Sequence, residues 1–285
     1  MEILIALIPA VMWGSILLVS TKLGGGPYQQ GVGTTIGALI FSVAAFFFTS
    51  PEFTWTIVIV SFISGLMWAL GQMNQFKTAK HLGVSKTLPI STGMQLAGTS
   101  LFGVLVFGEW STTMTLTIGI TAIVLVIAGV VFTSFREKNG DDEGESPMKK
   151  GIPLLLLSTA GFVGYVVIIR WFSVDGWDAI LPQSVGMVTG ALLLSIKHKP
   201  FTKYTFRNLI PGLMWAAGNI ALLLSIPRVG TATSFSLSQT GIIISTLGGI
   251  FLLGEKKTKK QMIMVIFGCV LIIAGGVLLG FTREG

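Results

Sequence analysis

The sequence predicts an all-α integral membrane protein with ten membrane-spanning helices. Three observations carry this prediction: ten long segments without Asp, Glu, Lys or Arg, a charged fraction of only 11%, and a strongly polar segment near the chain midpoint. Soluble domains have about 25% charged residues. A soluble chain of 285 residues could not bury an apolar share of 52%, so the class of soluble globular proteins is excluded.

Each uncharged segment is 18 residues or longer. A helix of that length extends about 27 Å, close to the roughly 30 Å hydrocarbon core of a bilayer. Because lipid offers backbone groups no hydrogen-bond partner, such segments are expected to cross the membrane as helices. In chain order the segments are 3–21, 23–51, 53–76, 87–108, 110–135, 151–169, 179–196, 208–227, 229–254 and 261–282.

The basic residues predict the orientation of these helices. Ten spans put both termini on one side of the membrane, and the loops after spans 1, 3, 5, 7 and 9 then hold 16 of the 19 basic residues. The opposite side has only Arg170, Arg228 and Arg283. The positive-inside rule therefore predicts that the odd-numbered loops are cytoplasmic and that both termini lie outside. Topology thus explains the net charge of +7, and no nucleic-acid partner is expected.

The two halves of the chain resemble each other, which predicts an internal repeat. Gly65-Leu-Met-Trp-Ala69 recurs as Gly212-Leu-Met-Trp-Ala216, and Gly108-Glu109 recurs as Gly254-Glu255. Because five is odd, the second copy would enter the membrane from the opposite side. The expected division is a first five-helix repeat over 1–133, a polar cytoplasmic linker over 134–150 and a second five-helix repeat over 151–285.

An inverted repeat is the architecture of many secondary transporters, whose substrate sites lie near the membrane midplane. A duplicated bundle without transport activity is the alternative. Two Gly-x-x-x-Gly pairs, Gly33/Gly37 and Gly186/Gly190, lie in a third matched stretch and each place two small residues on one helix face. Packing inside the bundle is the favoured interpretation of these pairs, and a dimerisation face is the alternative.

Neutral aromatic and amide side chains lie near the middle of the predicted spans. An amide has one acceptor and two donors, which match adjacent sugar hydroxyls, and an indole offers a flat apolar face to sugar C–H groups. Trp68, Gln72 and Gln75 follow i, i+4, i+7 spacing and share a helix face. Helix packing and interhelical hydrogen bonding are the alternative roles. The candidate substrate-binding residues are Trp13, Trp68, Gln72, Gln75, Gln95, Trp215, Asn219 and Gln239.

No catalytic residue set or metal-binding motif is recognisable, so we expect no enzyme activity, no cofactor and no metal site. Cys269 is the single cysteine, which excludes an intramolecular disulfide. Glu109 and Glu255, at helix ends, are the carboxylates that could carry a proton. Capping of a helix end is the alternative role for both.

Several motifs resemble the glucose/ribose uptake porters of the drug/metabolite transporter superfamily. The match follows the chain in order over nearly its whole length. Its most specific stretches are Ser91-Thr-Gly-Met-Gln95 and Ser234-Phe-Ser-Leu-Ser-Gln239. Further matching stretches are Gly24-Gly-Gly-Pro-Tyr-Gln29, Trp68-Ala-Leu-Gly-Gln72, Gly108-Glu-Trp110 and Ser245-Thr-Leu-Gly-Gly249.

The resemblance implies the drug/metabolite transporter fold and alternating-access uptake of a monosaccharide, with glucose the first expectation, through the bacterial cell membrane. It implies a substrate-binding role for Trp68, Gln72, Gln75, Gln95 and Gln239. Proton symport and facilitated diffusion both stay open, as does the oligomeric state. Ribose uptake, export of a small neutral or zwitterionic metabolite, and a non-transporting receptor are the alternatives.

Overall fold

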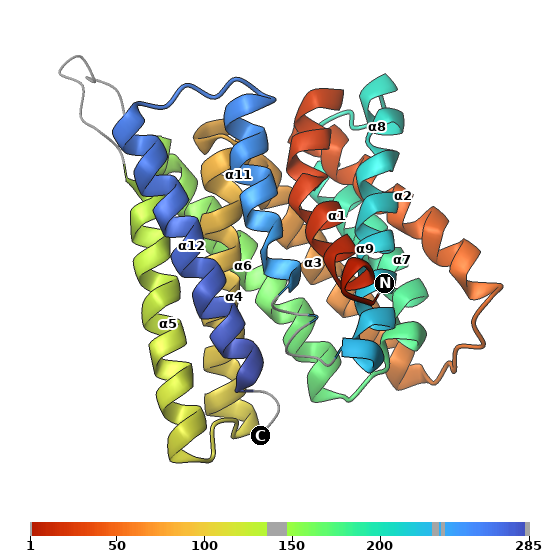
Figure 1. Cartoon of the computed structure of the whole chain (residues 1–285). Coiled ribbons are helices and arrows are strands. Elements are labelled where there is room, and N and C mark those ends of the chain that lie inside the picture. Colours follow the sequence, from red (N-terminus) through yellow and green to blue (C-terminus); the bar gives the residue numbers. More distant parts are fainter. Residues whose placement is uncertain (1, 136–146, 230–233, 235–236, 283–285) are drawn as a thin grey trace. The chain divides into compact units, whose positions relative to one another are not determined.

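The computed structural model describes residues 2–135, 147–229, 234 and 237–282. Within these residues the secondary structure is helical throughout (Figure 1). The helices are α1 (Glu2–Leu23), α2 (Pro27–Phe46), α3 (Trp55–Leu82), α4 (Val84–Phe107), α5 (Thr113–Ser134), α6 (Pro147–Trp171), α7 (Gly176–Ser195), α8 (Lys203–Arg207), α9 (Leu209–Val229), α11 (Gly241–Phe251) and α12 (Lys259–Phe281).

In the described part of the chain, nine helical segments are long and apolar enough to cross a membrane. Their surfaces carry many exposed large apolar side chains, among them Leu105, Val131 and Ile266. Such a surface suits lipid rather than water, so the chain is a multi-pass membrane protein. A shorter apolar helix, Leu237–Phe251, lies within the predicted ninth span, part of which falls outside the described residues. Most of the predicted linker 134–150 also falls outside them.

The chain divides into two compact units. Unit 1 comprises residues 1–18, 78–153 and 218–285, and unit 2 comprises residues 19–77 and 154–217. Each unit contains helices from both predicted repeats, so this spatial grouping is distinct from the predicted division along the sequence. The repeat boundaries stay a prediction.

In unit 1, α5 packs along α12 and against α4, which in turn packs against α11 (Figure 1). The backbones of α5 and α12 touch at two glycines. A Cβ at Gly129 would lie 2.6 Å from the Gly268 carbonyl oxygen, and a Cβ at Gly268 would lie 2.6 Å from the Gly129 carbonyl oxygen. Small residues allow such close approach between helices in lipid. The surrounding apolar cluster contains Leu96, Ala122, Val126, Ile242, Val265, Cys269, Ile272 and Leu279.

In unit 2, glycines make two helix crossings that resemble each other. Gly37 of α2 lies against the backbone of α9 at Gly212, and Gly186 of α7 lies against the backbone of α3 at Phe62. Gly65, the sequence equivalent of Gly212, also faces the backbone of α7. The interpretation of the Gly-x-x-x-Gly pairs as packing positions inside the bundle is therefore confirmed.

Candidate functional site

Two of the predicted tryptophans meet in a ring cluster of unit 2. Trp68 of α3 and Trp215 of α9 are both buried, with ring centroids 5.2 Å apart and planes at 61°. Phe162 of α6 packs edge-on to Trp68, with centroids 6.2 Å apart and planes at 78°. These edge-to-face arrangements are the favoured geometry of aromatic pairs. The three rings make a rigid apolar corner of the kind that a sugar ring can contact with its C–H groups.

The sequence did not single out Phe162, because one more apolar residue in an apolar helix gives no signal. Gly71 explains its position: a Cβ there would lie 2.9 Å from the Phe162 ring, so the missing side chain lets this ring rest on α3. Ser158, one turn earlier on α6, donates a hydrogen bond of 2.8 Å to the Gly71 carbonyl oxygen. Ring packing and this hydrogen bond together fix α6 against the part of α3 that carries Trp68.

The amides of α3 are buried and bonded to each other. Gln72 Nε2 donates to Gln75 Oε1 at 3.2 Å, and both side chains are 4% exposed. The predicted shared helix face is consistent with this bond, which spans one turn of α3.

A second polar chain in unit 2 links three helices. Gln183 Nε2 of α7 donates to Ser64 Oγ of α3 at 2.8 Å, and Ser64 Oγ donates to the Tyr165 carbonyl oxygen of α6 at 2.9 Å. Gln183 was not among the predicted site residues. Its bond to Ser64 supports the alternative role of an amide that joins helices.

In unit 1, two predicted glutamines lie on α4 and directly before α11. Gln95 is half-buried, and its Nε2 donates to Ser91 Oγ at 3.0 Å. Gln239 is 9% exposed, and its Nε2 donates to Ser238 Oγ at 3.1 Å. A Cβ at Gly276 of α12 would lie 3.0 Å from Gln239 Cγ, so the glutamine stem rests on this helix.

Trp13 and Asn219 also belong to unit 1. A Cβ at Gly218 would overlap the Trp13 indole, so this ring lies directly on α9 beside Asn219. Each unit thus contains four of the eight predicted residues. Unit 1 contains Trp13, Gln95, Asn219 and Gln239, and unit 2 contains Trp68, Gln72, Gln75 and Trp215.

An apolar surface groove of about 250 Å³ lies on α3 and α6 of unit 2. Its lining residues are Met67, Gly164, Val167, Ile168, Trp171 and Phe172. A polyol that entered it would lose hydrogen bonds to water and meet almost no polar lining surface, which costs free energy. We therefore exclude this groove as a sugar site.

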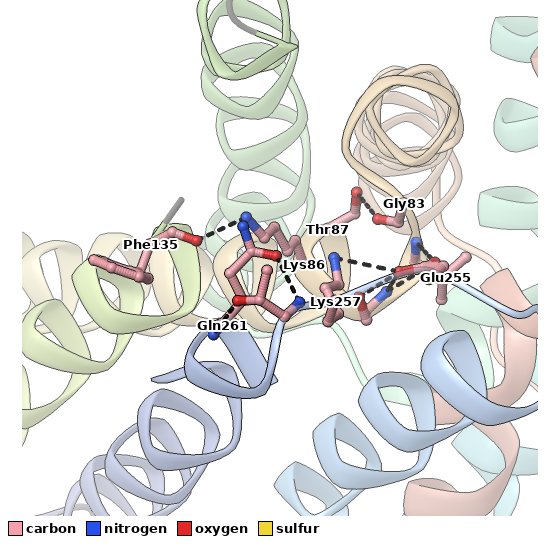
Figure 2. Close-up of polar contacts among 10 residues, drawn as sticks. Gly83, Lys86, Thr87, Phe135, Glu255, Lys257 and Gln261 are labelled. Carbon is pink, nitrogen blue, oxygen red and sulfur yellow. Dashed lines mark hydrogen bonds and ion pairs between the residues drawn. The ribbon is translucent and has the colours of Figure 1, made fainter. Parts of the chain in front are cut away.

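The carboxylate of Glu255 caps the N-terminus of α4 (Figure 2). Oε1 accepts from the backbone N–H groups of Val84, at 2.5 Å, and Ser85, at 3.3 Å. The Ser85 hydroxyl donates to Oε2, and Lys257 Nζ lies 3.7 Å from the same oxygen. A negative charge is favoured at a helix N-terminus, where unpaired N–H groups point outward. Glu255 therefore has the capping role that was the alternative to carrying a proton.

Two lysines accompany this cap. Lys86, 8% exposed, donates from Nζ to the Phe135 carbonyl oxygen at 2.9 Å, which places a cation at the C-terminal end of α5 (Figure 2). Lys257 is 9% exposed. Burial lowers the pKa of Lys257 from its ordinary 10.5, while the Glu255 charge and hydrogen bond act in the opposite direction. Both ammonium groups thus lie next to a backbone or side-chain acceptor of unit 1.

Comparison with known proteins finds relatives over the whole chain. The model of a family described as Sugar transport protein matches residues 4–282. The chain is 58% identical over 284 residues to the Glucose uptake protein GlcU of Bacillus subtilis, with 99% of each chain covered. It is 60% identical to a Bacillus cereus protein provisionally named as a sugar uptake protein, which covers 99% of this chain and 100% of that protein. It is 56% identical to a Priestia megaterium protein provisionally named as glucose uptake protein GlcU, with both chains covered in full.

One solved structure, titled only as the crystal structure of a protein, shares the fold. The alignment has a TM-score of 0.60 and covers 99% of this chain and 98% of the other. Sequence identity is 15%, so this likeness concerns the fold alone.

Proposed function

Because the chain belongs to the family of sugar transport proteins, whose model matches residues 4–282, we propose that it imports a monosaccharide by alternating access. Glucose is the substrate that we propose first, and the bacterial cell membrane is the location. The family description also agrees with the expectation of a transporter rather than an enzyme.

The observation that carries this proposal is the identity of 58% with the glucose uptake protein of Bacillus subtilis along 99% of both chains. The chemistry of the candidate residues agrees with an uncharged substrate, because amides and indoles recognise hydroxyls and C–H faces without a net charge.

We assign the candidate residues roles within their own units. In unit 1, Gln95, Asn219 and Gln239 exchange hydrogen bonds with sugar hydroxyls, and Trp13 provides an apolar face. In unit 2, Trp68 and Trp215 provide the apolar corner, and Gln72 and Gln75 provide amide groups beside it. Gln95 and Asn219 are half-buried, which agrees with their proposed roles.

We further propose ten spanning helices, and a parity argument supports this number. The Glu255 carboxylate bonds the Val84 N–H, so the loops before α4 and after α11 lie on the same side of the membrane. An even number of spans must then separate them. In the described residues, five candidate spans lie between these loops, so we propose that the shorter helix Leu237–Phe251 belongs to a sixth crossing.

The proposed inverted repeat is supported by two loops with the same backbone. Gly108 and Gly254 both have φ of 67°, a left-handed conformation that favours glycine. The following glutamate N–H donates to a glycine carbonyl six residues earlier in each case, at 3.0 Å from Glu109 to Gly103 and at 3.1 Å from Glu255 to Gly249. Two copies of one ancestral loop would have this shared geometry.

The proposal is tested with purified protein in liposomes. Vesicles loaded with unlabelled glucose should take up labelled glucose by counterflow, and a panel with ribose and close analogues ranks the substrates. An exporter of another metabolite would show no sugar exchange. A receptor without transport activity would bind sugar in detergent and give no flux. An inward proton gradient separates symport, which it accelerates, from facilitated diffusion, which it leaves unchanged.

The site residues are tested by Gln95→Ala and Gln239→Ala. Loss of one hydrogen bond costs about 0.5–1.5 kcal/mol, so each variant should raise the KM for glucose by about 2- to 12-fold. Gln261→Ala is the matched control, because Gln261 lies at the N-terminus of α12 and caps it. Unchanged KM in both variants, at equal amounts of reconstituted protein, would remove the two amides from the site.

A further inference from the structure

Two helices of unit 1, α4 and α11, run in opposite directions and meet at both ends of their shared length. At the start of α4, a Cβ at Gly249 would lie 2.8 Å from the Ser85 backbone nitrogen, so the helix backbones nearly touch. Three turns further along α4, Leu96 shares a buried apolar cluster with Ile242 of α11.

The second meeting point is also where the two glutamines lie. Gln95 immediately precedes Leu96, and Gln239 lies three residues before Ile242. A Cβ at Gly276 of α12 would lie 3.0 Å from Gln239 Cγ and 3.5 Å from Leu96 Cδ1, so one point of α12 supports both. Any sliding of α4 along α11 would therefore change the spacing of Gln95 and Gln239.

Glu255 fixes the first meeting point (Figure 2). It follows the end of α11, and its carboxylate accepts hydrogen bonds from two backbone N–H groups and one hydroxyl of the first residues of α4. The turn between α3 and α4 has space for this carboxylate because residue 83 is a glycine. Gly83 has φ of 79°, and a Cβ there would lie 2.7 Å from Glu255 Oε2. Hydrogen bonds to an ionised acceptor are about twice as strong as neutral ones, so this contact resists sliding.

We propose that Glu255 is a positioning residue for sugar recognition, which sets the register between Gln95 and Gln239 by locking the start of α4 to the end of α11. The proposal rests on the proposed function, because it needs both glutamines to bind the sugar. Gln95 lies eleven positions after Val84, so the contact acts over about 16 Å along α4. Glu255 itself does not touch the sugar.

The test compares Glu255→Ala with the full-length wild type in liposomes. We expect the KM for glucose to rise at least fivefold and the ratio of glucose to ribose uptake to change at least threefold, with kcat within twofold. Amide hydrogen exchange at Val84 and Ser85 should become at least tenfold faster. Glu255→Gln keeps one acceptor oxygen and should give smaller changes of the same kind.

Glu52→Ala is the matched control, since it removes an exposed carboxylate near a helix end of unit 2. It should leave KM, uptake ratio and exchange at Val84 and Ser85 unchanged. A purely structural cap would lower the amount of folded protein and leave KM and the uptake ratio of the folded fraction unaltered. The change in uptake ratio is therefore the readout specific to positioning.

Two outcomes overturn the proposal: faster exchange at Val84 and Ser85 with unaltered KM and uptake ratio, or unaltered exchange in Glu255→Ala. If Glu255→Ala does not fold, Gly249→Ala replaces it, because its added methyl group would separate α11 from Ser85 with every charge retained. An unaltered uptake ratio in that variant would equally overturn the proposal. Absence of sugar counterflow in the wild type would instead contradict the proposed function.

Discussion

At the scale of single residues, Lys257 combines burial with one close anionic partner. Its side chain is 9% exposed, and its Nζ lies 3.7 Å from Glu255 Oε2. Desolvation disfavours the charged form of a lysine, and the nearby carboxylate favours it. The pKa is lowered on balance, so burial outweighs the ion pair at this position.

This lowered pKa makes stability depend on pH in a defined direction. Between the lowered pKa of the folded state and the ordinary 10.5 of the unfolded state, the unfolded chain binds more protons. The contribution of Lys257 to stability therefore increases as pH rises through this interval. Lys257→Met removes this contribution, so the Tm of the wild type relative to Lys257→Met should increase towards alkaline pH in detergent.

Lys256→Met provides the control for this measurement, because Lys256 is its exposed neighbour with the same charge. The Tm difference between wild type and Lys256→Met should stay constant over the same interval. If the Tm of the wild type and of Lys257→Met changed equally with pH, burial would not lower the pKa of this lysine.

Local spacing predicted some residue contacts and not others. Trp68, Gln72 and Gln75 were expected on one face of α3, and the hydrogen bond from Gln72 to Gln75 fits that expectation because it depends only on helix geometry. The contact between Glu255 and Val84 joins residues 171 positions apart. Such a contact depends on how the helices pack, and no local sequence pattern predicts which helices will contact each other.

At the scale of helices, nine of the ten uncharged segments match candidate spans of the described residues, but some of their ends differ. The third uncharged segment ends at residue 76, whereas α3 continues to Leu82 through Lys77 and Lys80. Charge marks where the hydrocarbon ends, and a helix can continue into water beyond that point. It ends when the backbone turns at Gly83, whose φ of 79° is left-handed.

The glycine contact between α5 and α12 predicts the effect of a single added carbon atom. Gly268→Ala would place a Cβ 2.6 Å from the Gly129 carbonyl oxygen and 2.7 Å from the Thr133 backbone nitrogen, so the helices must separate. Overpacking of this kind typically costs about 1–3 kcal/mol. Thermal unfolding in detergent should therefore show a lower Tm for Gly268→Ala than for the wild type.

Val270→Ile is the matched control, because it also adds one carbon atom but at a side chain that is 53% exposed. Its Tm should remain at the wild-type value. Equal destabilisation by both substitutions would mean that α12 does not use Gly268 as its contact with α5.

At the scale of the whole molecule, the proposed orientation in the membrane rests on the charge distribution and on one contact. The positive-inside rule assigns the turn before α4 and the loop after α11 to the cytoplasm, because lysines lie on both sides of the turn and within the loop. The hydrogen bond from Val84 to Glu255 independently requires these loops to share a side. The charge pattern could have placed the two loops on opposite sides of the membrane. Because the charge pattern and the hydrogen bond agree, they support the proposed orientation with both termini outside.

Single cysteines provide the direct test of that orientation. Cys269 is buried in α12, so Cys269→Ala gives a background without thiols. Ser111→Cys lies in the exposed loop between α4 and α5, which the proposal places outside, and Lys199→Cys lies in the exposed loop after α7, which it places in the cytoplasm. A membrane-impermeant maleimide applied to intact cells should label Ser111→Cys at least tenfold faster than Lys199→Cys, and permeabilised cells should label both. The opposite labelling order in intact cells would contradict the proposed orientation. In the reverse orientation, 16 of the 19 basic residues would face outward, against the positive-inside rule on which the proposal rests.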